Sequence, residues 1–189
     1  MKMRTTGYIL LSIITTLSGL AFLASCNGNR GIEEKVNDMR SKPIKLCLED
    51  MQCRNKYGDT IVVDSIKPSY RMVVYVDSSV CSPCTLDKMF LWNESIKKAR
   101  QQGNRLKYVF IVAPKPEQLE DAYLSIESNG LDSPVYVDTA YAFRRANPHL
   151  PQERMYHSFL LDAKDSVVIV GNPMENPKID SLINKIVNQ

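Results

Sequence analysis

The sequence predicts an α/β fold in which a mixed central sheet is covered by helices on both faces. Residues 72–76 and 108–112 are continuous apolar runs rich in β-branched and aromatic side chains, which is typical of strands buried on both faces. A segment of helical period separates them, and this βαβ order implies a parallel pair with a right-handed crossover. A hairpin and a last helix near the C-terminus add antiparallel strands.

Capping residues delimit the elements that follow the first strand. Apolar side chains recur at helical spacing from Leu86 onward, and glycines and prolines interrupt that period. The expected boundaries are Gly103 for the end of the first helix, Pro116 and Gly130 for the second, residues 134–137 for a short strand, and Asp138 and Ala146 for a short third helix.

The pattern changes towards the C-terminus. Residues 158–161 and 167–170 are two strand-like runs that flank the polar turn 162–165, which predicts a hairpin. Asn176 and Pro177 are suited to cap and open a last helix, whose apolar residues recur at helical spacing.

Residues 1–25 have the pattern of a cleavable export signal. Lys2 and Arg4 precede an almost wholly apolar stretch that is shorter than the ~20 residues of a membrane-spanning helix. The stretch ends in Leu-Ala-Ser-Cys, which resembles a bacterial lipobox and implies that Cys26 is lipidated and becomes the new N-terminus. Acyl chains there would hold the protein on a membrane, and an ordinary secreted protein is the alternative.

Residues 26–42 are polar, and we interpret them as the lipidated cysteine and a flexible tether. As a coil, this tether would reach only ~20–25 Å, so the domain would work close to the membrane surface. We expect residues 43–69 to be an N-terminal extension of the domain, with an edge strand at 60–63. Residues 70–189 are expected to form the domain itself, which is long enough for one core.

The charge of the chain gives no reason to expect a nucleic acid as partner. Cleavage would remove Lys2 and Arg4 from the 24 basic residues and leave 22 against 21 acidic residues, a net charge near +1. We interpret the basic cluster of Lys97, Lys98 and Arg100 as a solvated helix face.

Two of the remaining cysteines form a C-x-x-C motif, Cys81-Ser82-Pro83-Cys84, where the first buried strand meets the following helix. This arrangement resembles the thioredoxin fold, and more closely the TlpA-like thiol–disulfide oxidoreductases, including short lipoprotein members of Bacteroidetes type. The segments that carry the resemblance are Tyr75-Val76-Asp77, the C-x-x-C motif, Ser158-Phe159-Leu160-Leu161-Asp162 and Val170-Gly171-Asn172-Pro173, within residues 70–188.

The resemblance implies a thioredoxin-like three-layer sandwich, whose mixed central sheet combines a parallel βαβ half with a C-terminal β-hairpin and helix. Three positions depart from the family pattern. Val80 stands where an aromatic residue usually precedes the first cysteine, and Tyr75 stands where a buried acid is common. Tyr156, or His157 if the register moves by one, stands where the family has a cis-proline, and we expect a trans bond there because a cis bond before a non-proline residue costs about 2.5–4 kcal/mol.

The spacing of Cys81 and Cys84 itself favours disulfide exchange. Unpaired N–H groups and the helix dipole at a helix start stabilise a thiolate, which is the form that attacks disulfides. We expect Cys81 to be exposed, with a pKa lowered into a range of roughly 3.5–7.5, and Cys84 to be the more buried resolving thiol. Pro83 fits the first helical turn, where its missing N–H costs nothing.

Four further residues are candidates for supporting roles. Cys47 and Cys53 are predicted to form a structural disulfide, with two unlinked buried thiols or a relay pair as alternatives. Asp77 could assist proton transfer to Cys84, although an Asp that ends a strand more often caps the next turn. His157 could tune the thiolate, although a strand histidine is more often exposed or packed in the sheet.

The sequence therefore predicts a membrane-tethered thiol–disulfide oxidoreductase that acts on protein thiols or disulfides. It needs no cofactor or metal, but it does need a redox partner in the cell envelope. The expected location is the periplasm-facing side of the envelope, with the outer membrane favoured by Asn27 after Cys26. Two alternatives stay open: a non-catalytic binding module whose Cys81–Cys84 bond is structural, and a Cu(I) carrier using Cys81, Cys84 and His157.

Overall fold

The computed structural model describes residues 31–60, 68–79, 83–103 and 105–189. The chain divides into two compact units, Met1–Asp38 and Met39–Gln189. The predicted signal peptide, lipidation at Cys26 and most of the predicted edge strand at 60–63 lie outside the described residues. Within the described residues, no helix combines the length and the apolar character needed to cross a membrane.

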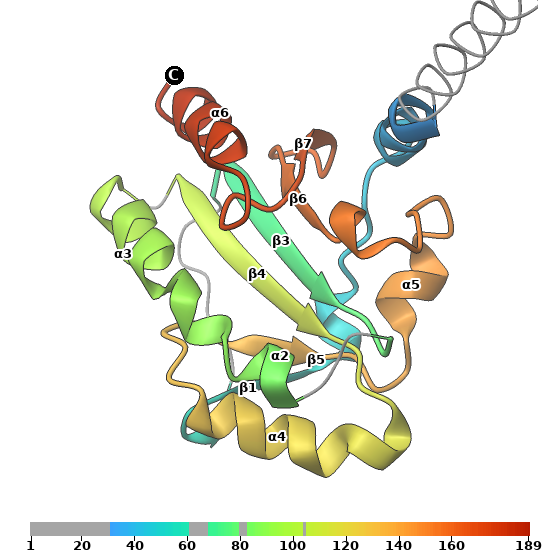
Figure 1. The fold of residues 1–189 in the computed structure, drawn as a ribbon, viewed down its shortest axis with the longest axis vertical. Helices are drawn as coiled ribbons and strands as arrows, with labels where there is room; N and C mark the ends of the chain where they lie inside the picture. The colour runs from blue at the N-terminus through green and yellow to red at the C-terminus, as the bar shows by residue number, and fades with distance from the viewer. Residues whose placement is uncertain (1–30, 61–67, 80–82, 104) are drawn as a thin grey trace, which may run out of the picture. The chain divides into compact units, whose positions relative to one another are not determined.

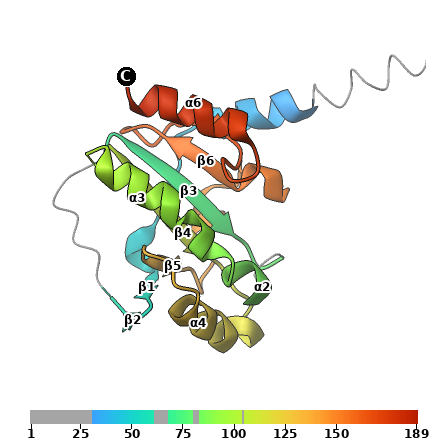
Figure 2. The same ribbon diagram turned by 60° about the vertical axis from the view of Figure 1, so that its left-hand side comes forward.

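A seven-stranded mixed sheet forms the centre of the second unit, in the order β2-β1-β5-β4-β3-β6-β7. β3 (Tyr70–Val76) and β4 (Leu106–Val112) are parallel, and β4 is parallel to β5 (Val135–Val137). β6 (Ser158–Leu161) is antiparallel to β3 and to β7 (Val167–Val170), as the hairpin pattern predicts. The parallel half and the antiparallel C-terminal hairpin therefore meet at β3, which Figures 1 and 2 show near the middle of the sheet.

One face of the sheet carries the larger apolar core. The register of β3 and β4 places alternate residues such as Val74 and Phe110 side by side on this face. They pack with buried side chains of α3 (Asn93–Gln101), α4 (Leu119–Ser128) and α6 (Pro177–Val187). The alternation works because successive side chains of a strand point to opposite faces.

The opposite face is covered by α5 (Ala142–Ala146), so β3 and β4 run between α3 and α5 in Figure 1. Phe143 of α5 is fully buried, and its ring centroid lies 4.8 Å from that of Tyr75. Asp138 caps this helix as predicted, because its carboxylate accepts hydrogen bonds from the backbone N–H groups of Ala142 and Phe143 at 2.8 and 2.9 Å. The sheet therefore has helices on both faces.

The helix expected after residue 86 is broken into three pieces. α2 (Pro83–Leu86) is a single turn, η2 (Met89–Trp92) is a 3₁₀ segment, and α3 follows it to Gln101. Gly103 follows α3 with a φ of 82°, a backbone conformation that glycine adopts without strain. Likewise, η3 (Pro116–Gln118) precedes α4, and η4 (Arg154–Tyr156) precedes β6.

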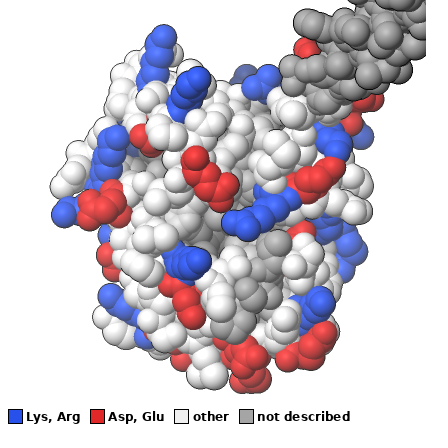
Figure 3. Space-filling model, viewed as in Figure 1, with Lys and Arg blue, Asp and Glu red and all other residues white. Residues whose placement is uncertain are grey.

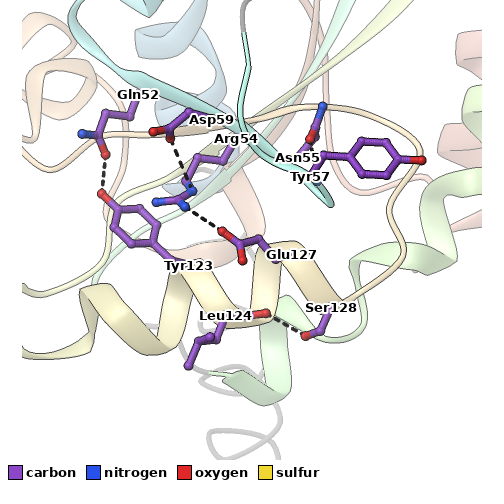
Figure 4. Close-up of polar contacts among 9 residues, drawn as sticks. All are labelled: Gln52, Arg54, Asn55, Tyr57, Asp59, Tyr123, Leu124, Glu127 and Ser128. Carbon is purple, nitrogen blue, oxygen red and sulfur yellow. Dashed lines mark hydrogen bonds and ion pairs between the residues drawn. The ribbon is translucent and has the colours of Figure 1, made fainter.

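The N-terminal extension adds two strands that the sequence did not predict at these positions. After η1 (Leu48–Asp50), β1 (Gln52–Asn55) pairs antiparallel with β5 and with the short β2 (Gly58–Asp59). Figure 4 shows the contacts that hold this hairpin on α4: the Arg54 guanidinium lies 2.6 Å from a Glu127 oxygen and 3.9 Å from the centroid of the Tyr123 ring. The extension is therefore built into the sheet edge.

Residues 31–40 form a helix, where the polar sequence predicts a flexible tether. Apolar residues recur at helical spacing at Ile32, Val36 and Met39. This short period explains the helix, although the segment is polar in overall composition. Met39 is fully buried, and Arg40 donates a hydrogen bond to the carbonyl of Val168 at 2.8 Å. The domain therefore begins before residue 43, because Met39 and Arg40 already belong to it.

Candidate functional site

Cys84 lies in α2, the single helical turn that follows β3 in the chain, and its thiol is free and exposed. The sequence predicts that Cys84 is the more buried of the two motif thiols; because Cys81 lies outside the described residues, that comparison stays a prediction. Leu86, two residues later, is fully buried, and two residues turn an α-helix by about 200°. With Leu86 facing the core, Cys84 faces away from it. Cys81, Ser82 and the side chain of Pro83 lie outside the described residues, so their predicted roles stay predictions.

A buried side chain fixes the end of α2 against the neighbouring helix. Asn129 follows α4, is 8% exposed, and donates a hydrogen bond from Nδ2 to the carbonyl of Leu86 at 3.1 Å. Its Oδ1 accepts from the backbone N–H of Leu131 at 2.9 Å, so both ends of the amide are used. The sequence does not mark Asn129 as part of the site, although its place just before Gly130 indicates a helix end.

Asp77 follows β3 and caps the turn that leads towards the C-x-x-C motif. Its Oδ1 accepts from the backbone N–H of Ser79 at 2.9 Å and from the Ser79 hydroxyl at 2.6 Å. This is the capping role that the sequence favours for an Asp at a strand end. Its second oxygen, Oδ2, lies 3.8 Å from Nδ1 of His157.

His157 is a packed, buried histidine, since it is only 3% exposed. Its Nε2 lies 3.2 Å from the carbonyl oxygen of Pro151, and because a carbonyl can only accept, Nε2 carries the hydrogen. Nδ1 is buried and has no hydrogen-bond partner among the described residues. Burial lowers the pKa of His157 from its ordinary value of 6.5, while the nearby Asp77 carboxylate acts in the opposite direction.

Two tyrosines lie close to this histidine, Tyr75 in space and Tyr156 as the preceding residue in the chain. The Tyr75 ring lies 5.2 Å from the His157 ring, and the Tyr75 N–H donates to the His157 carbonyl at 2.9 Å. Tyr156 is buried at the end of η4, and no peptide bond in the described parts of the chain is cis, as expected for this position. Burial, then the Asp77 and Asp138 carboxylates, raise the pKa of Tyr75 well above its usual value, so it stays neutral.

Cys47 and Cys53 carry free thiols in the structure, in place of the disulfide that the sequence favours. Cys47 precedes η1 with a φ of 53° and directs its thiol to the Lys45 carbonyl at 3.8 Å. Cys53 lies in β1 opposite Tyr136. Burial raises the pKa of both thiols, and Glu49 and Asp50 add to the effect at Cys47.

Charged side chains of both signs are interspersed over the face shown in Figure 3, and neither sign gathers there into one large patch. Among the residues that the structure describes, no three His, Cys, Asp or Glu side chains form a group that could hold a metal ion. Cys81, which the copper hypothesis requires, lies outside them. The imidazole of His157 is turned inward, with Nε2 already engaged, which does not favour that hypothesis.

Comparisons with known proteins give likenesses of structure alone. No family model matches the chain, and no curated protein matches it by sequence. A thioredoxin-like protein, solved in its oxidised form, has a TM-score of 0.52 at 17% identity and covers 79% of this chain and 96% of its own. Its likeness confirms the predicted thioredoxin-like fold.

Two further solved structures match less well. One is a proposed protein disulfide isomerase from Bacteroides thetaiotaomicron, with a TM-score of 0.49, 16% identity and coverage of 77% of this chain and 86% of its own. The other is a proposed thiol:disulfide interchange protein, DsbE, from Chlorobium tepidum, with a TM-score of 0.46, 19% identity and coverage of 77% and 97%.

Proposed function

Because the chain has a thioredoxin-like fold, we propose that it is a thiol–disulfide oxidoreductase that exchanges disulfides with protein thiols through Cys81 and Cys84. The observation that carries this proposal is the position of Cys84: an exposed thiol in the turn of helix that follows the central strand β3, three residues after a second cysteine. Buried Leu86 and the Asn129 amide hold that turn in place, so the thiol is presented on a fixed support.

The exchange proceeds in two steps that balance without a further reagent. The Cys81 thiolate attacks a substrate disulfide, forms a mixed disulfide with one substrate sulfur and releases the other as a thiolate. The Cys84 thiolate then attacks Cys81, forms the Cys81–Cys84 disulfide and releases the second substrate thiolate. The substrate gains two electrons and the motif loses two, and the reverse sequence oxidises a substrate.

A reduction assay with the full chain in detergent tests this proposal. We expect the reduced protein to cleave a model protein disulfide, Cys81→Ser to abolish the reaction, and Cys84→Ser to accumulate the mixed disulfide with its substrate. Cys53→Ser is the matched control, because Cys53 is part-buried in β1, and it should retain activity. Full activity in Cys81→Ser would exclude this chemistry.

We also propose that Cys26 anchors the protein by lipid to the periplasmic side of the cell envelope, at the outer membrane rather than the inner. The support is the Leu-Ala-Ser-Cys sequence and the Asn27 that follows it. A partner in the envelope must then supply or remove electrons. Mass measurement of the N-terminal peptide tests the anchor, and an unmodified, uncleaved Cys26 would contradict it.

A further inference from the structure

A continuous set of polar contacts joins the loop at Pro151 to the turn at Ser79. It runs from the Pro151 carbonyl to Nε2 of His157 at 3.2 Å, and from Nδ1 of the same ring to Oδ2 of Asp77 at 3.8 Å. Oδ1 of Asp77 then accepts from the backbone N–H and hydroxyl of Ser79. Ser79 stands two residues before Cys81, so these contacts end at the segment that carries the thiols.

The contact between Nδ1 of His157 and Oδ2 of Asp77 has no hydrogen between its two atoms. Since Nε2 carries the hydrogen of the neutral ring, Nδ1 presents a lone pair towards a carboxylate oxygen, and two acceptors cannot bond to each other. The His157 side chain is 4% exposed and the Asp77 side chain 21%, so water does not freely replace the missing partner. A single proton on Nδ1 would turn this contact into a charge-assisted pair.

The charged groups around the imidazole act in both directions. Asp77, at the end of β3, and Glu153, just before η4, favour the protonated ring, whereas burial and Arg144 of α5 oppose it. The Tyr75 ring, packed on the other side, stays neutral. Burial is the largest of these effects, so the pKa of His157 lies below its ordinary value and the ring gains its second proton only on acidification.

We propose that His157, acting through Asp77, is a positioning residue for thiol–disulfide exchange: the pair takes up one proton and thereby sets the charge that the Cys81–Cys84 motif experiences. This proposal rests on the function proposed above. With the proton on His157, the charge of the Asp77 carboxylate is compensated, and its other oxygen still accepts from Ser79. Without it, the Asp77 carboxylate keeps an uncompensated negative charge four residues before Cys81 in the chain, and a negative charge near a thiol disfavours its thiolate.

Alkylation of the motif thiols across pH tests the proposal in the full chain. For wild type, we expect the rate of iodoacetamide labelling at Cys84 and Cys81 to follow two ionisations, the lower one absent in His157→Gln. Below that ionisation, labelling of wild type should exceed that of His157→Gln by roughly 3–10-fold, the effect that we expect when the charge of Asp77 is compensated. The only other histidine in the chain gives the control, His149→Gln, which should match wild type.

Nuclear magnetic resonance of the imidazole nitrogens provides a second measurement. It does not depend on whether His157→Gln folds. With two histidines in the chain, both rings can be assigned through His149→Gln. We expect neutral His157 to carry its hydrogen on Nε2, and its pKa to fall further in Asp77→Asn. A hydrogen on Nδ1, a titration indifferent to Asp77→Asn, or identical labelling profiles in wild type and His157→Gln would each overturn the proposal. Neither method requires the reduction of a substrate. If the chain lacks oxidoreductase activity but the His157–Asp77 pair still titrates as described, only the proposed function is overturned.

Discussion

The side chain of Asn147 pairs with the backbone of Lys45 through two hydrogen bonds. Nδ2 donates to the Lys45 carbonyl and Oδ1 accepts from the Lys45 N–H, at 2.8 and 2.9 Å. Nδ2 also donates to the carbonyl of Phe143 in α5, and Asn147 is fully buried. One amide thus joins the N-terminal extension to the helix that covers the Tyr75 side of the sheet.

Replacing Asn147 with Ala should therefore destabilise the domain. It removes three hydrogen bonds, to the N–H and carbonyl of Lys45 and to the carbonyl of Phe143, and each contributes about 0.5–1.5 kcal/mol. We expect a loss of about 2–4 kcal/mol in the free energy of unfolding, measured by denaturant titration, and faster hydrogen exchange at the Lys45 amide. Asn188→Ala removes an exposed amide that donates to the Asn184 carbonyl within the same helix end, so it should stay within about 0.5 kcal/mol of wild type.

Arg54→Ala should loosen the β1–β2 hairpin from α4. The guanidinium pairs with Glu127 at 2.6 Å and lies over the Tyr123 ring, and the side chain is only 17% exposed (Figure 4). We expect a loss of about 1–2 kcal/mol in unfolding free energy. Arg154→Ala removes a pair with Glu175 at 3.4 Å in which both side chains are about two-thirds exposed, and it should change stability by less than about 0.5 kcal/mol. Equal effects of the two variants would contradict this assignment.

The thiols should react in an order set by their surroundings. Cys84 is exposed, whereas burial raises the pKa of Cys47 and Cys53 and so reduces their thiolate fractions near neutral pH. Brief iodoacetamide treatment of the reduced, folded chain, followed by peptide mass mapping, should label Cys84 well before the other two. In denaturant the order should vanish, and faster labelling of Cys53 than Cys84 in the folded chain would contradict the structure.

The sequence predicts most of the domain because each buried strand and each cap carries a local signal. The runs around Val74 and Phe110 mark the central strands, and Asp138 and Asn176 cap helices where expected; the Asn176 side chain accepts from the Lys178 N–H at 3.0 Å. One signal is the recurrence of apolar residues every 2 residues in strands or every 3.6 in helices, and the other is the capping side chain. Both can be identified in the sequence without knowledge of the rest of the fold.

The features that escape prediction depend on contacts between distant parts of the chain. β1 is a strand because it pairs with β5, and its four residues QCRN have little strand propensity of their own. The inward position of His157 and its contact with Asp77, 80 residues away in the chain, arise only once β6 lies beside β3. The sequence could nominate both residues but not their pairing.

The stability of the domain should fall on acidification because of His157. Burial lowers its pKa below the ordinary 6.5, so in the window between the two values the unfolded chain binds a proton that the folded chain does not. The contribution is fully present above pH 6.5 and is lost as pH falls towards the folded-state pKa, with a limiting slope of about 1.4 kcal/mol per pH unit. Denaturant titrations from pH 7.5 to 5.5, above the range in which most carboxylates titrate, should show this slope in wild type and in His149→Gln but not in His157→Gln. A slope that persists unchanged in His157→Gln would mean that another group takes up the proton on unfolding.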